Sequence, residues 1–271
     1  MPELPEVETT HQGISPHLLG QQIQQLTVHQ HQLRWPVPPE LPEWVRNQTI
    51  QHLARRGKYL LLELHKGTLI IHLGMSGSLR VVAADAPRVK HEHIELQLKN
   101  GTLLRYHDPR RFGCWLWTTT PVVEHPLLRH LGPEPLSDTF SGHYLTTTLS
   151  TRIQAIKQTI MDSHVVVGVG NIYANEALFR SHIHPERPSH TLSMQECHCL
   201  RRNIRLVLRA AIRQGGTTLK DYVNSNGKPG YFAQKLLVYG RSGQPCLTCK
   251  TTLIDSRLGR RATVYCPHCQ H

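Results

Sequence analysis

The first half of the chain alternates short apolar runs with polar turn residues. Between about residues 22 and 119, the runs 60–64 and 69–73 flank Lys66-Gly67, and the runs 94–98 and 102–106 flank Asn100-Gly101. Dipeptides ending in glycine between two apolar runs are typical of tight hairpins. Repeated hairpins predict an all-β region, either a sandwich or a barrel.

A helix is expected ahead of this region, from residue 5 to about residue 19. Pro5 suits the first helical position, where its missing N–H costs nothing. Glu6 and Glu8 suit the positive end of the helix dipole. This helix would fix the amino terminus.

The second half changes to helical patterns after a proline-rich connection that runs from Pro121 to Pro135. We place a boundary near residue 131. Helices are expected over 153–161, 172–181 and 193–214, and the last begins at a Ser193-x-x-Glu196 capping box. These elements predict a small helical domain.

The charge balance indicates a polyanionic partner. Of the 271 residues, 31 are Lys or Arg and 19 are Asp or Glu, which gives a formal net charge of +12 with all 20 histidines neutral. Nucleic acid fits better than a membrane, because no apolar stretch approaches the ~18 residues of a spanning helix. No secretion signal stands at the start, so a reducing cytosol, as in a bacterium, is the expected compartment.

Four of the seven cysteines form two pairs near the carboxyl terminus, Cys246-x2-Cys249 and Cys266-x2-Cys269. This spacing is typical of a tetrahedral zinc site. A redox pair is the alternative, but no thioredoxin-like context surrounds these motifs. Four thiolates leave no open ligand position, so the zinc would be structural.

Pro2 offers a second kind of chemistry. Removal of Met1 would leave its ring nitrogen as a secondary amine, which titrates well below a lysine side chain. Such an amine can attack an aldehyde-like sugar carbon and form a cationic iminium, with Glu3 beside it as an acid. The alternative is that Pro2 merely starts a frayed terminus.

Three further segments suit contacts with nucleic acid. Arg110 and Phe112 share a loop, where a ring can wedge between bases and a guanidinium can bind a base edge, although a salt-bridged turn is the alternative. Met75 has the same ambiguity between wedge and core filler. Asn171 follows a glycine-rich turn that suits either phosphate binding or a plain turn.

Taken together, these residues resemble the formamidopyrimidine-DNA glycosylase family, also called 8-oxoguanine-DNA glycosylase/AP lyase. The resemblance runs from Pro2 to Cys269. Its matching segments are Pro2-Glu-Leu-Pro-Glu-Val-Glu-Thr9, Lys58-Tyr-Leu-Leu-Leu-Glu63, His72-Leu-Gly-Met-Ser-Gly-Ser78, Asp108-Pro-Arg-Arg-Phe-Gly113, Leu131-Gly-Pro-Glu-Pro135, Val167-Gly-Val-Gly-Asn-Ile-Tyr-Ala174 and the last four cysteines.

The resemblance implies an α+β multidomain fold. It comprises an N-terminal β-sandwich with a leading helix over 2–131, a helix-two-turn-helix domain over 132–225, and a region over 226–271 whose zinc-finger β-hairpin begins near 237. A loop around residues 217–231 would cover the extruded base. The implied cofactor is one zinc ion per chain, and the protein would act as a monomer on the bacterial nucleoid.

The resemblance also implies an excision mechanism for oxidised purines in duplex DNA. Pro2 would attack C1′ of a flipped nucleotide, Glu3 would assist as an acid, and β,δ-elimination would cut the strand. Lys58 is expected to assist β-elimination and Arg261 δ-elimination. Because a guanidinium is a poor proton donor, we expect Arg261 to neutralise the departing phosphate.

The remaining site residues are implied to contact DNA. His91, Arg152 and Asn171 would lie on the backbone or opposite strand. Met75, Arg110 and Phe112 would fill the space of the flipped nucleotide, and Arg110 facing an orphaned base would favour cytosine over adenine.

Two departures from the family pattern stand out. His11-Gln12 replaces the usual Arg-Arg, and Arg152 replaces a common lysine. The rival interpretations are an endonuclease VIII-like enzyme for oxidised pyrimidines and a non-catalytic zinc protein that binds damaged DNA. Leu4 and the Glu6-Val-Glu-Thr9 continuation favour the purine enzyme, and Pro2 with Glu3 argues against the binding protein.

Overall fold

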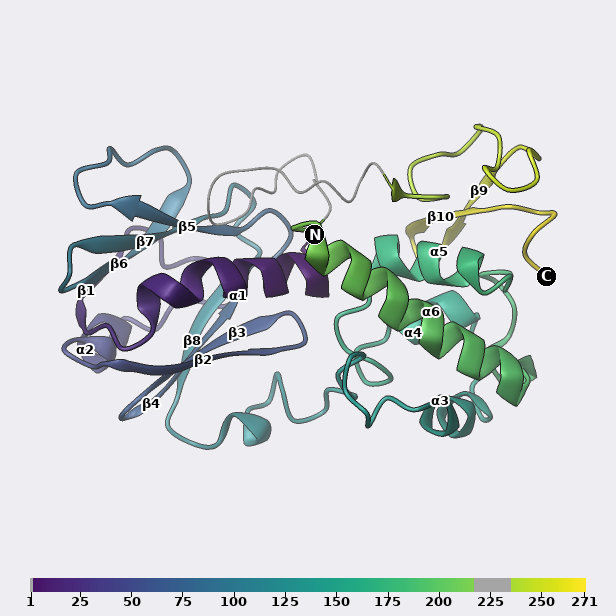
Figure 1. The fold of residues 1–271 in the computed structure, drawn as a ribbon. Coiled ribbons are helices and arrows are strands. Elements are labelled where there is room, and N and C mark those ends of the chain that lie inside the picture. Colours follow the sequence, from purple (N-terminus) through teal and green to yellow (C-terminus); the bar gives the residue numbers. More distant parts are fainter. Residues whose placement is uncertain (1, 217–234) are drawn as a thin grey trace. The chain divides into compact units, whose positions relative to one another are not determined.

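The computed structural model describes residues 2–216 and 235–271. These residues form two compact units (Figure 1). The first unit holds residues 2–129 and 214–216, and the second holds residues 130–213 and 235–271. Within the described residues, no helix combines the length and apolar character needed to cross a membrane. Residues 217–231, which are expected to cover the extruded base, lie outside the described residues. The described chain ends before them at Gly216.

The first unit contains two helices, eight strands and a short 3-10 turn over Val122–Glu124. Its elements are α1 (Leu4–Leu18), β1 (Ile23–Val28), α2 (Leu41–Val45), β2 (Ile50–Arg56), β3 (Tyr59–Leu64), β4 (Gly67–His72), β5 (Ser78–Ala83), β6 (Glu92–Leu98), β7 (Thr102–His107) and β8 (Cys114–Thr118).

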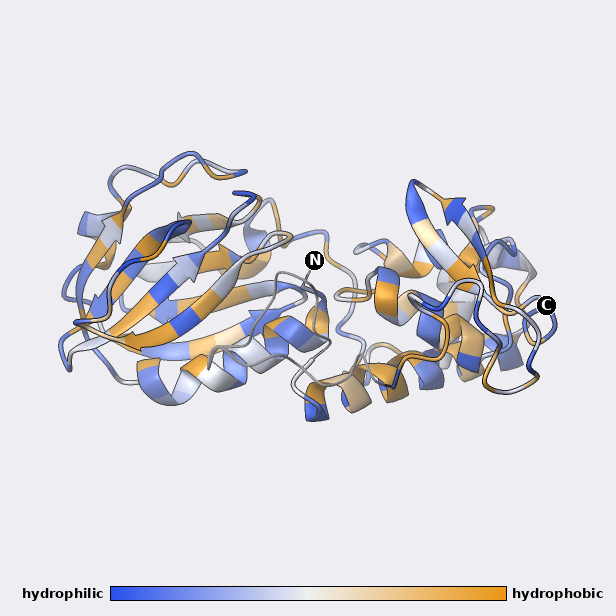
Figure 2. Ribbon diagram, turned by 90° about the horizontal axis from the view of Figure 1, so that it is seen from above, coloured by the Kyte–Doolittle hydropathy of each residue, from blue (hydrophilic) through white to orange (hydrophobic). Residues whose placement is uncertain are grey.

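These strands form two antiparallel four-stranded sheets, in the orders β1-β6-β7-β5 and β2-β3-β4-β8. Figure 2 shows apolar and polar positions alternating along them. In β6, Ile94, Leu96 and Leu98 are buried while the residues between them are half-buried. Side chains from both sheets, such as Leu62 and Leu104, join one apolar core. The fold is therefore a β-sandwich and not the barrel that the hairpin pattern by itself also allowed.

The expected first helix is confirmed as α1. Pro5 stands in its first turn, and Val7, Ile14 and Leu18 enter the sandwich core. The helix packs against β2, β3 and β5. Burial of this apolar face fixes the start of the chain against the sandwich.

The second unit contains four helices, a hairpin and a 3-10 turn over Ser189–Thr191. Its elements are α3 (Gly142–Leu149), α4 (Ile156–Met161), α5 (Asn171–Arg180), α6 (Met194–Arg213), β9 (Ile254–Leu258) and β10 (Arg261–Tyr265). The three helices expected from sequence are confirmed as α4, α5 and α6, with α4 beginning three residues later than expected.

The capping box expected ahead of α6 is also present. The Glu196 N–H donates to Ser193 Oγ at 3.3 Å, and the Ser193 N–H donates to Glu196 Oε2 at 2.7 Å. The sequence analysis missed α2 and α3, which are both short. The β9–β10 hairpin turns at Gly259 and Arg260, which both have positive φ. This backbone is typical of a two-residue hairpin turn.

Candidate active site and metal centre

The amino terminus is held at the start of α1. Pro2 is buried, and Glu3 exposes 3% of its surface. The Glu3 N–H donates to Glu6 Oε2 at 2.8 Å, and the Glu3 side chain accepts from the Glu6 N–H to complete a capping box. The frayed terminus considered above does not fit this arrangement, because Pro2 is buried directly before a capped helix start.

Gly216 packs against the same helix start. Its φ of +82° favours glycine, and a Cβ at this position would lie 3.1 Å from Glu6 Oε1. Gly216, directly before the loop expected to cover the base, thus leaves no room for a side chain beside the capping box.

Lys58 lies in the turn between β2 and β3, beside Gly57 at φ +57°. The turn is tied to α1 through Arg55. The Nε of Arg55 donates to Glu8 Oε2 at 2.6 Å, and the Nη1 of Arg55 donates to the Gly57 carbonyl oxygen at 2.8 Å. The helix that begins beside Pro2 therefore also positions the turn that carries Lys58.

His11, one of the two departures from the family pattern, supports this connection. Its Nε2 lies 3.0 Å from the Leu53 carbonyl oxygen, and its Nδ1 lies 3.7 Å from Glu8 Oε1. The close approach of His11 and the ion pair with Arg55 outweigh burial and lower the pKa of Glu8 to about 2. The nearby Glu8 carboxylate in turn raises the pKa of His11. His11 therefore has a structural role in this chain.

His72 is a neutral group close to Lys58. Burial, followed by the charge of Lys58, lowers the pKa of His72 to about 4. The Gly74 N–H donates to His72 Nδ1 at 2.9 Å, so Nε2 carries the proton. No separate sequence signal marked His72, because one of 20 histidines carries little information.

Asp108 organises the loops that carry the expected wedge residues. It is fully buried, and its Oδ1 accepts from Ser76 Oγ at 2.8 Å. Its Oδ2 accepts from the Tyr106 hydroxyl at 2.9 Å and from the Gly113 N–H at 3.0 Å. One carboxylate therefore joins the loop of Met75 to the loop from Asp108 to Gly113.

The three residues expected to act as wedges line one groove. Met75, Arg110 and Phe112, with Arg34 among their neighbours, line a groove of about 580 Å³. The guanidinium of Arg110 lies over the Phe112 ring, 4.9 Å from its centroid, and Phe112 is 41% exposed. An exposed aromatic ring held by a cation suits insertion into a base stack better than core packing.

His91 lies at the edge of these loops. Its φ is +71°, and its carbonyl oxygen accepts from the Asp108 N–H at 3.0 Å. Its ring meets those of His93 and His107 edge-on, at centroid distances of 6.2 and 6.0 Å. His91 thus belongs to the framework that Asp108 builds.

The second unit carries Arg152 and Asn171. Arg152 Nη1 lies 3.3 Å from Asp162 Oδ2, in the turn after α4. Asn171 is the first residue of α5, after Gly168 at φ +82° and the N-cap Gly170. A helix amino terminus favours anions, so the position of Asn171 suits a phosphate contact.

Arg261 begins β10 and is exposed. The strand is anchored from α4 by Lys157, a buried residue that the sequence analysis missed. Lys157 Nζ donates to the Ala262 carbonyl oxygen at 2.8 Å and to Thr263 Oγ1 at 2.7 Å. From α5, Asn175 Oδ1 accepts from the Val264 N–H at 2.9 Å. The hairpin is thus fixed directly beyond Arg261.

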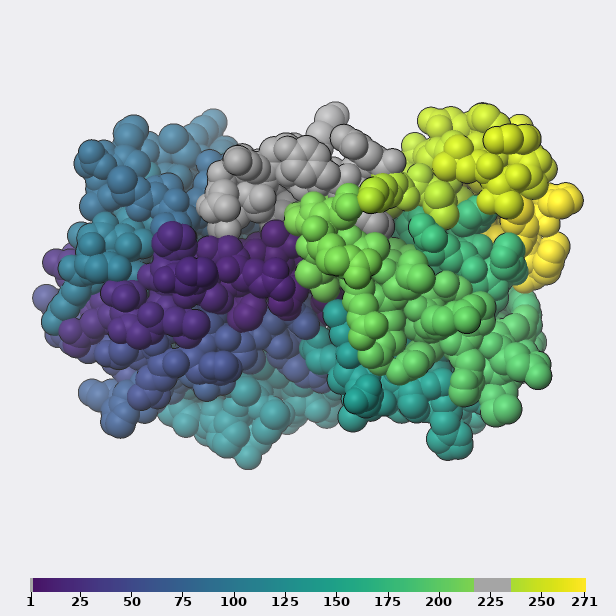
Figure 3. All heavy atoms as spheres, viewed as in Figure 1, coloured from purple at the N-terminus to yellow at the C-terminus, as the bar shows by residue number. Residues whose placement is uncertain are grey.

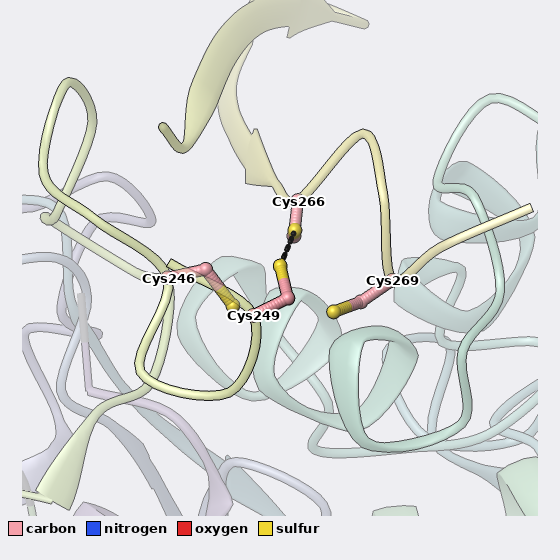
Figure 4. Close-up of side chains that lie close together, drawn as sticks. All are labelled: Cys246, Cys249, Cys266 and Cys269. Atoms are coloured by element: carbon pink, nitrogen blue, oxygen red, sulfur yellow. Dashed lines mark hydrogen bonds between the residues drawn. The ribbon is translucent and has the colours of Figure 1, made fainter. Parts of the chain in front are cut away.

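The four cysteines of the second unit converge, as Figure 4 shows. Their sulfur atoms all lie within 4.8 Å of one another, and Cys249 Sγ lies 3.4 Å from Cys266 Sγ. A tetrahedral zinc ion with bonds of about 2.3 Å separates its sulfur ligands by roughly 3.8 Å. The donor set therefore fits one zinc ion.

Three regions of the sequence match known domains. Residues 1–115 match the formamidopyrimidine-DNA glycosylase N-terminal domain, residues 131–223 match the H2TH domain of the same enzymes, and residues 243–271 match the zinc finger found in FPG and IleRS. The chain belongs to the formamidopyrimidine-DNA glycosylase family. The resemblance and the fold class expected from sequence are both confirmed.

Curated members of the family match along their whole length. The formamidopyrimidine-DNA glycosylase of Marinobacter nauticus is 57% identical over 270 residues, with 100% of both chains covered. That of Saccharophagus degradans is 54% identical, again with 100% of both chains covered.

Solved structures of the family share the fold. The MutM (Fpg) protein of Thermus thermophilus matches with a TM-score of 0.89 and 38% identity, covering 99% of this chain and 98% of its own. A Lactococcus lactis FPG mutant, in a complex with DNA that contains Fapy-dG, matches with a TM-score of 0.93 and 33% identity, covering 100% of both chains.

Family membership and geometry together establish the metal centre. Cys246, Cys249, Cys266 and Cys269 form the zinc site of the family's finger. Val238, Leu253 and Val264 pack around the cysteines and shield the site. With four thiolates as ligands, zinc here has a structural role.

Proposed function

We propose that this chain is a bifunctional glycosylase and AP lyase that excises oxidised purines from duplex DNA during base excision repair. The observation that carries the proposal is the terminal proline held at a capped helix start, in a chain that matches the family over its whole length. Two structures of the Lactococcus lactis relative, a mutant with DNA containing Fapy-dG and the wild type with DNA containing N7-benzyl-Fapy-dG, support the substrate class.

In the proposed first step, the Pro2 nitrogen attacks C1′ of the damaged nucleotide. The bond from C1′ to the base breaks, and the base leaves with the bonding electrons and takes up the proton that the Pro2 nitrogen loses. The nitrogen lone pair then breaks the bond from C1′ to O4′, O4′ receives a proton from Glu3, and the opened sugar is joined to Pro2 as an iminium. Glu3, the N-cap of α1, is the acid nearest to Pro2 in the chain, and its burial favours proton transfer away from bulk water.

In the proposed second stage, the iminium acts as the electron sink for two eliminations. Loss of a C2′ proton breaks the bond from C3′ to the 3′ phosphate, with Lys58 assisting. Loss of the C4′ proton then breaks the bond from C5′ to the 5′ phosphate, and Arg261 neutralises the departing phosphate. A guanidinium stays charged, so Arg261 suits charge stabilisation rather than proton donation.

Base extrusion is assigned to the wedge residues. Met75, Arg110 and Phe112 would fill the vacated space and offset the few kcal/mol that unstacking costs. Arg110 offers donors to the orphaned base, so a cytosine carbonyl is preferred to an adenine amino group. His91, Arg152 and Asn171 would contact the backbone or the opposite strand.

We further propose that the protein acts as a monomer on the nucleoid in the bacterial cytoplasm, with one zinc ion per chain. The division into regions 2–131, 132–225 and 226–271 is retained as a prediction about which parts carry catalysis, backbone binding and the finger.

Borohydride trapping tests this proposal. We expect a covalent adduct on a duplex with 8-oxoguanine opposite cytosine and a much weaker one from Pro2→Gly, which keeps a primary amine but loses the secondary amine, and which still binds the lesion because its groove is intact. A matched Pro87→Gly variant should trap normally. An adduct chiefly on a dihydrothymine duplex would move the assignment to the endonuclease VIII-like enzymes, and tight binding without any adduct would indicate a recognition protein or a retained Met1.

A further inference from the structure

Helix α6 carries a row of arginines that the proposed function does not use. Arg201, Arg205, Arg209 and Arg213 follow one another at intervals of four residues. On a helix with 3.6 residues per turn, such residues share one side and rise about 6 Å from one to the next. Arg202 lies beside the row and lines the same groove.

The row is unfavourable for the isolated helix. Like charges at i and i+4 repel each other, and the row contains three such pairs. Glu196, the one acidic residue in the sequence of α6, is paired with Arg187. Burial, followed by the charges of Arg201 and Arg209, lowers the pKa of Arg205, and nearby Asp138 offsets only part of this. A partner with negative charge would relieve this repulsion.

Part of the row is held in place. Arg201 Nε donates to the Phe140 carbonyl oxygen at 2.8 Å, and Arg205 Nη1 donates to the Ser137 carbonyl oxygen at 2.9 Å. Carbonyl groups neutralise no charge, so both guanidiniums keep their full charge in fixed positions. Less side-chain entropy is then lost when an anion binds.

The arginines line a groove that also exposes apolar side chains. A groove of about 430 Å³ is lined by the five arginines and Leu206, which is 46% exposed. A second groove, of about 490 Å³, shares Arg201 and Arg202 and includes Met194, which is 59% exposed. The two grooves share residues and therefore form one surface along α6, the arginine groove, which carries five arginines and the exposed apolar side chains of Met194 and Leu206.

The arginine groove is separate from the residues assigned to DNA in the same unit. The apolar side of α6, which includes Leu200, Ile204 and Leu208, is buried, and the helix packs on α3 and α5. None of the residues that line the groove is Arg152, Asn171 or Arg261. Figure 3 shows the outer side of α6, in green, uncovered by other described residues of its unit.

We propose that the arginine groove binds an extended acidic peptide segment of a partner protein, with aspartates or glutamates alternating with large apolar residues. Residues on one side of an extended strand repeat at about 6.8 Å, which is close to the 6 Å rise of the arginine row. The side chains between the acids point to the other side of the strand, so they cover Leu206 and Met194 where the strand lies edge-on to α6. A DNA backbone matches the charge but offers these two residues only sugar C–H groups, so a peptide is favoured.

The test measures fluorescence anisotropy of the zinc-loaded full chain with a labelled nine-residue peptide that alternates aspartate and phenylalanine. We expect binding that weakens as salt rises. Peptides with asparagine for aspartate, or with serine for phenylalanine, should each bind about ten-fold more weakly. Failure of the first peptide to bind, or equal binding of all three, would overturn the proposal.

Variants locate the site. Arg202→Glu combined with Arg209→Glu changes two exposed arginines and should weaken peptide binding about ten-fold or more. The pair Arg46→Glu and Lys99→Glu, exposed in the first unit, changes the net charge equally and should leave binding within about two-fold. If both pairs of substitutions weaken peptide binding equally, the binding depends on net charge alone, and the proposal of a specific groove is contradicted.

Leu206→Ser tests the apolar contact without changing charge. It should weaken the phenylalanine peptide several-fold and leave the serine peptide unchanged. All variants should keep the thermal unfolding midpoint and normal lesion excision, since the groove is outside the proposed catalytic residues. If Arg202→Glu with Arg209→Glu instead lowers affinity for an undamaged duplex while peptide binding is unchanged, the groove is a DNA contact and the peptide proposal is wrong.

Discussion

Lys157 on α4 holds Thr263 on β10, with its ammonium group 2.7 Å from the Thr263 hydroxyl. The same group donates to the Ala262 carbonyl oxygen, and Lys157 is 1% exposed. A buried cation is costly unless hydrogen bonds compensate for lost water. This arrangement fixes the strand that begins at Arg261, so a buried lysine positions the exposed arginine.

We predict that Lys157→Met loosens β10 and slows δ-elimination more than β-elimination. The change leaves the Ala262 carbonyl and the Thr263 hydroxyl without this donor, which costs about 1–3 kcal/mol of stability. Displacement of Arg261 should reduce the δ-product roughly ten-fold. Gel analysis of products from an abasic duplex, with exposed Lys99→Met as control, measures the ratio. An unchanged product ratio in a destabilised protein would show that Lys157 is only structural.

We predict that Asp108→Asn weakens lesion binding and stability together. The two carboxylate oxygens of Asp108 accept hydrogen bonds from Ser76, Tyr106 and Gly113. In asparagine, an NH2 group that cannot accept replaces one of these oxygens. One donor is then left unpaired in a buried position, at about 1–3 kcal/mol. Urea unfolding and binding to an abasic duplex measure both effects. Exposed Asp85→Asn should change neither, and normal lesion affinity in Asp108→Asn would contradict the role of Asp108 in arranging the wedge loops.

The Glu8 interactions predict a pH-dependent contribution to stability. The folded pKa of Glu8 is about 2 against 4.5 for the ordinary carboxyl, so its contribution is complete above about pH 4.5 and is lost as the pH falls toward 2. The folded pKa of His11 is raised above 6.5, so its contribution is present below that pH and is lost as the pH rises through the raised value.

The stability lost in Glu8→Gln should therefore be largest between these ranges. We expect a larger difference from the natural chain near roughly pH 5.5 than near pH 8, and a smaller one again near pH 3. Urea unfolding at the three pH values measures it. Exposed Glu43→Gln should show no such maximum. A difference that is the same at all three values would mean that His11 and Glu8 are not coupled.

We predict that Cys249→Ser loses zinc and DNA affinity together. Metal binding supplies much of the folding energy of such fingers, about 10–16 kcal/mol in isolated finger peptides. The finger positions Arg261, so its loss should also reduce strand cleavage. Metal analysis and duplex binding test this, with Cys199→Ser as the control outside the cluster. Normal duplex binding by a zinc-free variant would contradict the prediction.

The short helices show where sequence patterns fail. α3 spans Gly142–Leu149 and contains three consecutive threonines, which have modest helix propensity. It is stabilised by burial of Leu145 and Leu149 and by the Ser141 cap, whose Oγ accepts from the Tyr144 N–H at 3.0 Å. The burial is visible only with the neighbouring helices, and a serine cap by itself does not identify a helix of eight residues. By contrast, the long periodic pattern of α6 identified that helix correctly.

His11 shows the same limit for the site. As a sequence feature, it marked only the loss of two family arginines. In the structure, it contacts Glu8 and the Leu53 carbonyl and supports the connection from α1 to the Lys58 turn. Leu53 lies on β2, more than forty residues away, so local pattern cannot reveal the contact.

The sequence by itself determined the hairpins, the long helices, the cysteine ligands and the family, because turn residues, periodicity and motif spacing are local properties of the chain. The tertiary structure alone decided how the strands are ordered in the two sheets, that Asp108 joins the loops of Met75 and Phe112, and that Lys157 holds β10. Each of these depends on burial. A polar side chain removed from water must find its partners among whichever residues the fold brings near, and that choice is made only when distant segments pack together.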